Sequence, residues 1–139
     1  MVHRGQCHCG AIQLELDSDM PRESITCRIC SCRFCQCHAP RYWSHPDAHL
    51  AISDPRQKLT RYRFGTSSAD FVFCSVCGTF LAALCQIDDG NFAVLNLNCI
   101  SGMNAAALPS AILSYDAEDL GQRLARRKRN WMPARLNSV

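Results

Sequence analysis

The order of apolar and polar residues along the chain predicts a series of strands. Between residues 11 and 17, Ile12, Leu14 and Leu16 alternate with polar side chains, and this period of two is typical of a half-buried strand. Further strands are predicted at residues 24–28, 49–53, 58–64, 70–74, 79–86, 92–99 and 112–115. A turn over residues 88–91, which contains Gly90, joins two of them as a hairpin. The pattern therefore predicts a mainly β fold.

One short helix is predicted near the C-terminus. Asp116 is a suitable N-cap for a helix that runs to about residue 129, with acidic residues in its first turn and arginines in its last, as the helix dipole favours. Leu120, Leu124 and Trp131 would form its apolar stripe. We interpret the basic run at residues 126–129 as a solvated face, with an acidic partner or nucleic acid as the alternative.

The length indicates a single domain, residues 1–139. We also expect the protein in the cytoplasm, for two reasons. No apolar run approaches the roughly 20 residues of a membrane span, and the N-terminal segment lacks the apolar stretch of a secretory signal. The chain nevertheless contains 11 cysteines, which is an odd number. This many cysteines without an export signal indicate metal binding rather than a disulfide framework.

Two cysteine pairs, each followed by a glycine, predict a structural metal site. Cys7 and Cys9 flank one residue near the N-terminus, and Cys74 and Cys77 form a Cys-x2-Cys pair much later in the chain. A glycine after each pair can adopt the positive φ that turns backbone N–H groups towards the sulfur atoms. Together the pairs supply four sulfur ligands, which is the set of a structural zinc site that links distant segments of a small β domain. Idle, buried thiols are the alternative.

Five further cysteines lie within residues 27–37 and predict a second metal site. Neighbouring cysteines on a short segment pair poorly as disulfides, whereas short spacings wrap readily around one tetrahedral ion. The compact triplet is Cys30, Cys32 and Cys35, and three protein ligands with one open position are the pattern of a catalytic zinc. The pairs Cys27–Cys30 and Cys35–Cys37 are alternatives. If Cys37 reached the ion, the site would be closed and structural.

The residues that follow the triplet are candidates for chemistry beside the metal. His38 could move a proton or contact the substrate, although a surface or packed histidine is the commoner alternative. Tyr42 and Trp43 could line a pocket next to the ion, although aromatic residues in such loops more often cover the edge of a core.

The net charge argues against nucleic acid as a partner once metal is considered. The formal charge of the chain is +3. One zinc ion on four thiolates leaves a charge of −2 and one on three thiolates leaves −1, so the two sites together cancel the bulk charge. The remaining basic character is local, in the arginine-rich segment near the C-terminus.

Three cysteine motifs occur in a fixed order along the chain: Gly5-Gln6-Cys7-His8-Cys9-Gly10-Ala11, Cys30-Ser31-Cys32-Arg33-Phe34-Cys35 and Phe73-Cys74-Ser75-Val76-Cys77-Gly78. Together they resemble the glutathione-dependent formaldehyde-activating enzyme family, also named for centromere protein V. The run Tyr62-Arg63-Phe64-Gly65-Thr66 is similar to one branch of that family. The resemblance covers nearly the whole chain.

The resemblance implies a β-tent of mostly antiparallel sheets with two zinc sites. The structural zinc would be on Cys7, Cys9, Cys74 and Cys77, and the second on Cys30, Cys32 and Cys35. In the family, carbon–sulfur lyase chemistry is placed at that second zinc, where formaldehyde and glutathione combine reversibly to S-hydroxymethylglutathione. The chain departs from the family pattern after the third cysteine of the triplet. A basic pair and His-Gly are usual there, but Gln36-Cys37-His38-Ala39-Pro40 stands here, so positive charge expected for an acidic substrate is missing.

We therefore expect a zinc-dependent carbon–sulfur lyase that acts on a small thiol or thiol–aldehyde adduct, with glutathione among the candidates. Its catalytic residues would be Cys30, Cys32, Cys35 and His38. The alternative is a non-catalytic zinc-binding module that binds a partner through its basic C-terminal helix. Metal storage or redox sensing ranks last, because the strands and paired cysteine motifs indicate a folded scaffold. The sequence gives no prediction of the oligomeric state.

Overall fold

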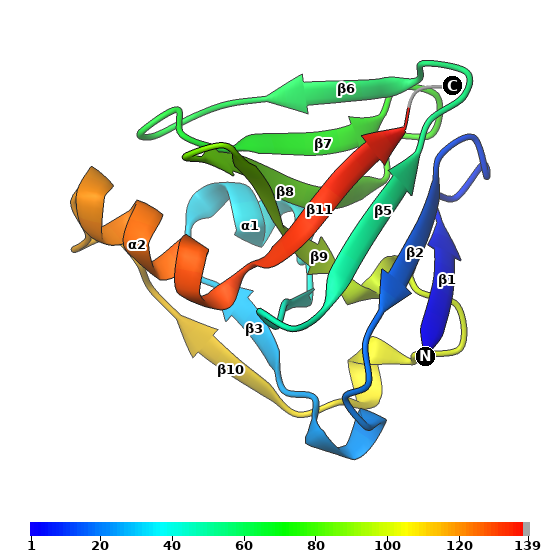
Figure 1. The fold of residues 1–139 in the computed structure, drawn as a ribbon, viewed down its shortest axis with the longest axis horizontal. Helices are drawn as coiled ribbons and strands as arrows, with labels where there is room; N and C mark the ends of the chain where they lie inside the picture. The colour runs from blue at the N-terminus through cyan, green and yellow to red at the C-terminus, as the bar shows by residue number, and fades with distance from the viewer. Residues whose placement is uncertain (138–139) are drawn as a thin grey trace.

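Strands account for most of the regular elements in the computed structural model, which describes residues 1–137. The strands are β1 (Val2–Gln6), β2 (Gln13–Asp17), β3 (Cys27–Cys30), β4 (Tyr42–Trp43), β5 (His49–Ser53), β6 (Leu59–Tyr62), β7 (Asp70–Cys74), β8 (Phe80–Ile87), β9 (Gly90–Asn96), β10 (Ser110–Leu113) and β11 (Met132–Asn137). The helices of the described chain are α1 (Arg33–His38), α2 (Leu120–Asn130) and the 3-10 helices Arg22–Ser24, Leu97–Cys99 and Ala105–Ala107. The prediction of a mainly β fold with a short C-terminal helix is confirmed (Figure 1).

The 11 strands of the described chain join one branched sheet. One path runs β1-β2-β5-β11-β9-β4-β3-β10, and β9 also pairs with β8, from which β7 and β6 continue as a second branch. Most neighbouring strands are antiparallel, but β11 runs parallel to β5 and β10 runs parallel to β3. Because β9 has β4, β8 and β11 as neighbours, it brings segments that are distant in sequence together.

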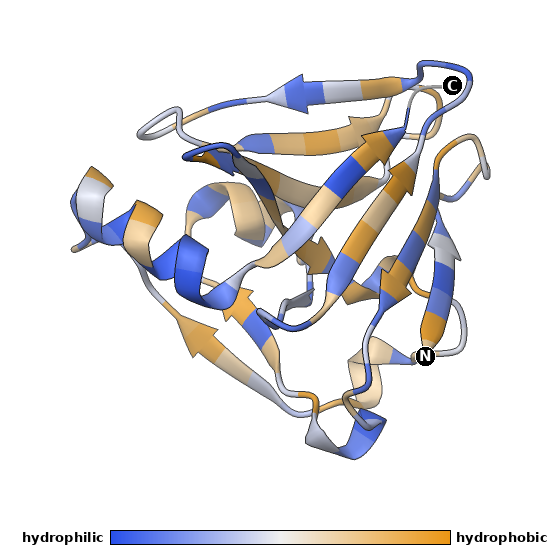
Figure 2. Cartoon of the chain, in the orientation of Figure 1, coloured by the Kyte–Doolittle hydropathy of each residue, from blue (hydrophilic) through white to orange (hydrophobic). Residues whose placement is uncertain are grey.

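The sequence predicts both β2, through its alternating pattern, and β5 correctly. Leu14 and Leu16 on β2 and Leu50 and Ile52 on β5 are buried, and Leu14 lies opposite Ile52 in the antiparallel pair. Figure 2 shows the alternation of hydrophobic and hydrophilic residues along β2, and an apolar middle of β5. These side chains belong to the main apolar core, where burying each one contributes roughly 1.5–3 kcal/mol.

Several local elements differ from the prediction. The strand expected at residues 24–28 begins only at Cys27, because Arg22–Ser24 first form a 3-10 turn. The strand expected to end at residue 99 stops at Asn96, whose side chain accepts a hydrogen bond from the N–H of Asn98 and so starts a 3-10 helix. The elements β1, β4, β11 and α1 are present where the sequence predicts neither strand nor helix.

Helix α2 begins later than predicted and buries a charged residue. Its N-cap is Asp119, which forms a capping box with Gln122, rather than Asp116. The predicted solvated face is wrong for Arg127, which is only 5% exposed, and the predicted apolar stripe is wrong for Leu120, which is 47% exposed. Tertiary packing explains both differences. Helix α2 is largely hydrophilic, as Figure 2 shows, and it packs against β8 through part of its basic face rather than through an apolar stripe.

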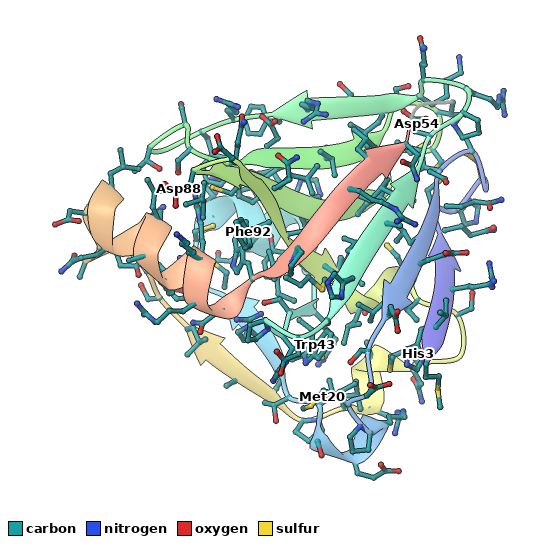
Figure 3. The ribbon with its side chains drawn as sticks, in the orientation of Figure 1. His3, Met20, Trp43, Asp54, Asp88 and Phe92 are labelled. Carbon is teal, nitrogen blue, oxygen red and sulfur yellow. The ribbon has the colours of Figure 1, made fainter. Side chains whose placement is uncertain are left out.

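An ion pair connects α2 to the turn between β8 and β9. Nζ of Lys128 lies 2.6 Å from the carboxylate of Asp88, and Figure 3 shows Asp88 beside the helix. After α2 the chain returns to the sheet as β11, between β5 and β9. Within residues 1–137, neither α-helix has the length and apolar character needed to cross a membrane.

Candidate metal centres and the adjoining cavity

Four cysteine thiols that are distant in sequence converge at one point of the fold. The sulfur atoms of Cys7, Cys9, Cys74 and Cys77, here called the first thiol group, lie within 4.8 Å of one another. Sγ of Cys9 is 3.7 Å from Sγ of both Cys7 and Cys74. The sulfurs of a disulfide would be about 2.05 Å apart, whereas sulfurs bound to one tetrahedral zinc at about 2.3 Å are about 3.8 Å apart. The donor set and its spacing therefore fit a metal ion.

Strand ends and tight turns hold the first thiol group. Cys7 follows β1 directly, and Cys74 is the last residue of β7. The glycine after each cysteine pair has a positive φ, +82° at Gly10 and +79° at Gly78, which glycine adopts without strain. The N–H of Ile12 donates to Sγ of Cys7 at 3.4 Å. The turns therefore direct N–H groups towards sulfur, as the sequence predicts.

Hydrogen bonds spread the thiol pKa values within the first thiol group. Burial raises the pKa of Cys77, but hydrogen bonds from the side chain and backbone of Thr79 and from the backbone of Cys9 outweigh it and bring the pKa to about 5. The backbone of Ala11 lowers the pKa of Cys9, but burial and the neighbouring thiols outweigh it and raise that pKa to about 11. The group therefore holds a thiolate at neutral pH, which metal binding requires.

The second thiol group consists of Cys30, Cys32 and Cys35, whose sulfur atoms also lie within 4.8 Å of one another. Cys30 ends β3, Cys32 is the N-cap of α1, and Cys35 lies in the first turn of that helix. The N–H of Cys35 donates to Sγ of Cys32 at 3.5 Å. The start of α1 therefore turns three sulfurs from one short segment towards a common point, which is the compact triplet that the spacing predicts.

Tyr42 is the polar partner of the second thiol group. Its hydroxyl oxygen lies 3.2 Å from Sγ of Cys35. Burial raises the pKa of Tyr42 far above its usual range, so the hydroxyl stays protonated and donates to the sulfur. A hydrogen bond from Cys35 in turn lowers the pKa of Cys30 to about 6. This group therefore also supplies a thiolate near neutral pH.

The other cysteines of residues 27–37 lie apart from this group. Cys27 is buried in the main apolar core, and Cys37 is exposed on α1. Among residues 1–137, the sulfurs that converge here are those of the triplet, without Cys27 or Cys37. The alternative pairs Cys27–Cys30 and Cys35–Cys37 are therefore not brought together as ligand sets.

His38 lies outside the second thiol group. It is the last residue of α1, and its ring centroid is 4.7 Å from that of Phe34 and 5.2 Å from that of Phe73. With Cys37 it lines a separate surface depression. His38 therefore lies apart from the triplet although it is close to it in sequence, because α1 turns the chain between Cys35 and His38.

A cavity of about 370 Å³ opens beside the second thiol group. All three of its cysteines line this cavity, and Tyr42 lies among them. Trp43, the other aromatic residue considered from the sequence, lies in the main core instead. The remaining lining residues combine apolar side chains with charged ones: Phe64, Phe71, Ala83, Val94, Trp131, Arg28, Tyr115, Asp116, Glu118, Arg123, Arg126 and Arg127, together with Gly65 and Thr66.

Arginine side chains give this cavity a positive character that the cysteine motifs do not predict. Arg126 forms hydrogen bonds of 2.8 and 3.1 Å with the carboxylate of Glu118, and its guanidinium lies 3.7 Å from the centre of the Tyr115 ring. Arg127 donates to the hydroxyl of Ser68 at 2.7 Å. The basic run at residues 126–129 is the one sequence feature that points to these arginines. Only the packing of α2 shows that Arg126 and Arg127 are the members of this run that line the cavity.

Comparison with known proteins is consistent with this arrangement. The family described as glutathione-dependent formaldehyde-activating enzyme matches residues 2–113, a range that contains both thiol groups and ends before α2. A crystal structure of a Rhodobacter sphaeroides protein is similar in fold, with a TM-score of 0.58 and 26% sequence identity. That similarity covers 78% of this chain and 99% of the Rhodobacter chain.

Proposed function

The chain belongs to the glutathione-dependent formaldehyde-activating enzyme family, and we propose that it is a zinc-dependent carbon–sulfur lyase acting on a small thiol or its aldehyde adduct. One observation carries the proposal. The second thiol group supplies three sulfur donors and lines a cavity of about 370 Å³, whereas the first thiol group supplies four donors. Four protein ligands are typical of a structural zinc, and three with an open position are typical of a catalytic one.

The donor set suits zinc, because thiolates are soft ligands that zinc favours. Zinc held by Cys30, Cys32 and Cys35 would supply a Lewis acid that favours the anionic form of a thiol or hydroxyl. The proposed reaction is reversible cleavage of an S-hydroxymethyl thiol. The hydroxyl proton leaves, the carbon–sulfur bond breaks with its electron pair on sulfur, and formaldehyde and a thiolate are released.

Residues around the second thiol group have separate roles in this proposal. Tyr42 donates to Cys35 and so orients a ligand and stabilises its negative charge. Phe71 and Val94 line the cavity and keep its wall apolar, which strengthens electrostatic interactions with the substrate. The chain thereby supplies a shaped site with a partly apolar wall beside the three sulfurs.

Asp116 is our candidate for accepting the hydroxyl proton. It lines the cavity. A hydrogen bond from Cys35 is the main cause that lowers the pKa of Cys30, and the negative charge of Asp116 acts in the opposite direction. The carboxylate is therefore close enough to influence the second thiol group. Glu118, the other lining carboxylate, already accepts two hydrogen bonds from Arg126. His38 stays a second candidate from the sequence, although it lies outside the cavity lining.

The test is turnover of S-hydroxymethyl thiols, including S-hydroxymethylglutathione, by protein with its zinc content measured. We expect formaldehyde release faster than the uncatalysed exchange, and loss of this rate in Cys32→Ser, which leaves the first thiol group intact. Exposed Cys37→Ser is the matched control and should retain the rate. Absence of any rate above the uncatalysed one, with two zinc ions per chain confirmed, would contradict the proposal.

The alternative, a non-catalytic zinc module, depends on Cys37 closing the second site and on a basic helix that faces a partner. Cys37 lies outside the triplet. Arg126 and Arg127 line the cavity beside the second thiol group instead of facing away from the protein. Both placements support the enzyme over the binding module.

A further inference from the structure

Two of the four arginines that line the cavity, Arg28 and Arg127, have no carboxylate partner among the residues that the structure describes. Arg123 and Arg126 both lie within 4.0 Å of Glu118, at 3.7 and 2.8 Å. Within residues 1–137, neither Arg28 nor Arg127 forms a salt bridge. The cavity therefore contains more positive charge than its own carboxylates neutralise.

Arg127 is the more deeply buried of these two residues, at 5% exposure. One guanidinium nitrogen, Nη1, donates to Ser68 Oγ at 2.7 Å and contacts Sγ of Cys85 at 3.6 Å. The guanidinium carbon lies 4.9 Å from the centre of the Trp131 ring. Nε is buried and has no hydrogen-bond partner in the part of the chain that the structure describes. A buried charge with an unused donor is costly unless a ligand completes its interactions.

Arg28 occupies a comparable position on β3. Its guanidinium donates to the hydroxyl of Ser44, which in turn donates to the carbonyl of Asn130 at the end of α2 at 2.7 Å. The partner is uncharged. Burial is the main cause that lowers the pKa of both Arg28 and Arg127, and it outweighs the opposing effects of Tyr115 on Arg28 and of Cys85 on Arg127. Both guanidiniums remain charged, because that group does not lose its proton in proteins.

We propose that Arg127, together with Arg28, forms an anion subsite in the same cavity as the second thiol group, and that it binds the carboxylate of a small thiol acid. The inference rests on the proposed function, in which the thiol end of that molecule reaches the three cysteines. Guanidinium groups recognise carboxylates through paired N–H donors. A volume of about 370 Å³ lies near the lower end of the roughly 300–1,000 Å³ of small-molecule pockets, which favours a compact thiol acid.

Helix α2 contributes the part of this subsite that lies beyond the family match, whereas Arg28 lies within it. The family match ends at residue 113, and Arg127 lies beyond it, on α2. The cysteine triplet can then serve the shared chemistry, while α2 selects the substrate. This also supplies, from elsewhere in the chain, positive charge that is missing directly after the triplet.

The test compares two ligands of matched size, 3-mercaptopropionate and 3-mercapto-1-propanol, by calorimetric titration of the zinc-loaded protein. We expect the carboxylate to bind at least about tenfold more tightly, with a preference that weakens as salt rises because the interaction is ionic. Arg127→Met and Arg28→Met should each reduce the preference to below about threefold. Arg129→Met, an exposed arginine on the same helix, is the control and should retain it.

The outcomes separate this subsite from the proposed reaction. Equal affinity of the unmodified protein for the two thiols would overturn the subsite, and this result needs no variant. If the protein also turned over uncharged S-hydroxymethyl thiols, the proposed lyase reaction would still hold. A carboxylate preference that depends on Arg127, without turnover of any adduct, supports the subsite and removes the lyase. A preference unchanged in both methionine variants, with zinc content and folding retained, would also overturn it.

Discussion

The hydroxyl oxygen of Tyr42 lies 3.2 Å from Sγ of Cys35, and the two residues are only 6% and 4% exposed. Tyr42 comes from β4 and Cys35 from α1, so this contact joins two elements around the second thiol group. The protonated phenol would stabilise the negative charge that Cys35 carries as a metal ligand, without itself occupying a coordination position. The contact therefore supports a three-sulfur site that stays open.

We expect Tyr42→Phe to weaken zinc binding at the second thiol group. The variant removes the hydrogen bond to Cys35 but keeps the ring, and loss of a partner to a metal ligand typically costs about 10- to 100-fold in affinity. Competition with a chelator measures this. Tyr62→Phe, on an exposed tyrosine, is the control, and equal zinc affinity in the two variants would show that the contact plays no part.

Loss of the first thiol group should unfold or strongly destabilise the protein. Cys9 and Cys74 are 65 residues apart in sequence, with sulfurs 3.7 Å apart, so a metal there would join β1 to β7. We expect Cys74→Ser to lower the free energy of unfolding by more than about 3 kcal/mol, since structural zinc contributes directly to folding. Denaturant unfolding of both serine variants measures this, and an equal or smaller loss than in Cys32→Ser would contradict the assignment of roles.

Asp70 should make stability depend on pH near the acid limit. Burial raises the pKa of this carboxyl, but Arg63 and Arg61, at 2.6 and 2.7 Å, outweigh it and hold the pKa below its ordinary value. Because the folded pKa lies below the unfolded value of about 3.9, the contribution is present above about pH 4 and is lost as pH falls through the folded pKa.

Asp70→Asn should therefore lower the free energy of unfolding by about 1 kcal/mol near pH 7, a small value because both arginines are about half exposed. The difference from the unmodified protein should shrink below about pH 4. Asp89→Asn, at an exposed carboxylate in the β8–β9 turn, is the control. A difference that grows as pH falls would have the wrong sign.

The two candidates for the proton can be separated by kinetics. We expect Asp116→Asn to lower kcat roughly 100-fold, within the range for removal of a general base, because Asp116 lines the cavity. His38→Asn should change kcat less than about threefold, since His38 lines a different depression. The reverse order of effects would restore His38 as the residue that moves the proton.

The sequence predicts what depends on local pattern and fixed spacing. Alternation locates β2, because one of its faces lies against the core, and the strands predicted at residues 49–53 and 70–74 coincide with β5 and β7. The Cys-x-Cys and Cys-x2-Cys pairs predict which four thiols converge, because four thiols around one ion require two pairs. The glycines that follow them adopt the expected positive φ.

What the sequence does not show depends on tertiary packing. Helix α1 has only six residues, too short for a periodic pattern, yet it turns Cys37 and His38 away from the triplet. Strand β11 alternates only over residues 134–137, a short run, and it is held by β5 and β9. Arg127 belongs to a basic run that is usually solvated, and its burial follows only from where α2 meets β8.

X-ray absorption at the zinc edge, combined with zinc per chain, tests the central claim most directly. The account predicts two zinc ions that share seven sulfur ligands and at least one lighter atom, about 3.5 sulfurs per ion on average, in both the unmodified protein and Cys37→Ser. Eight sulfurs for two ions, or loss of one sulfur in Cys37→Ser, would mean that the second site is closed. A single ion per chain in protein with reduced thiols would remove the catalytic zinc altogether.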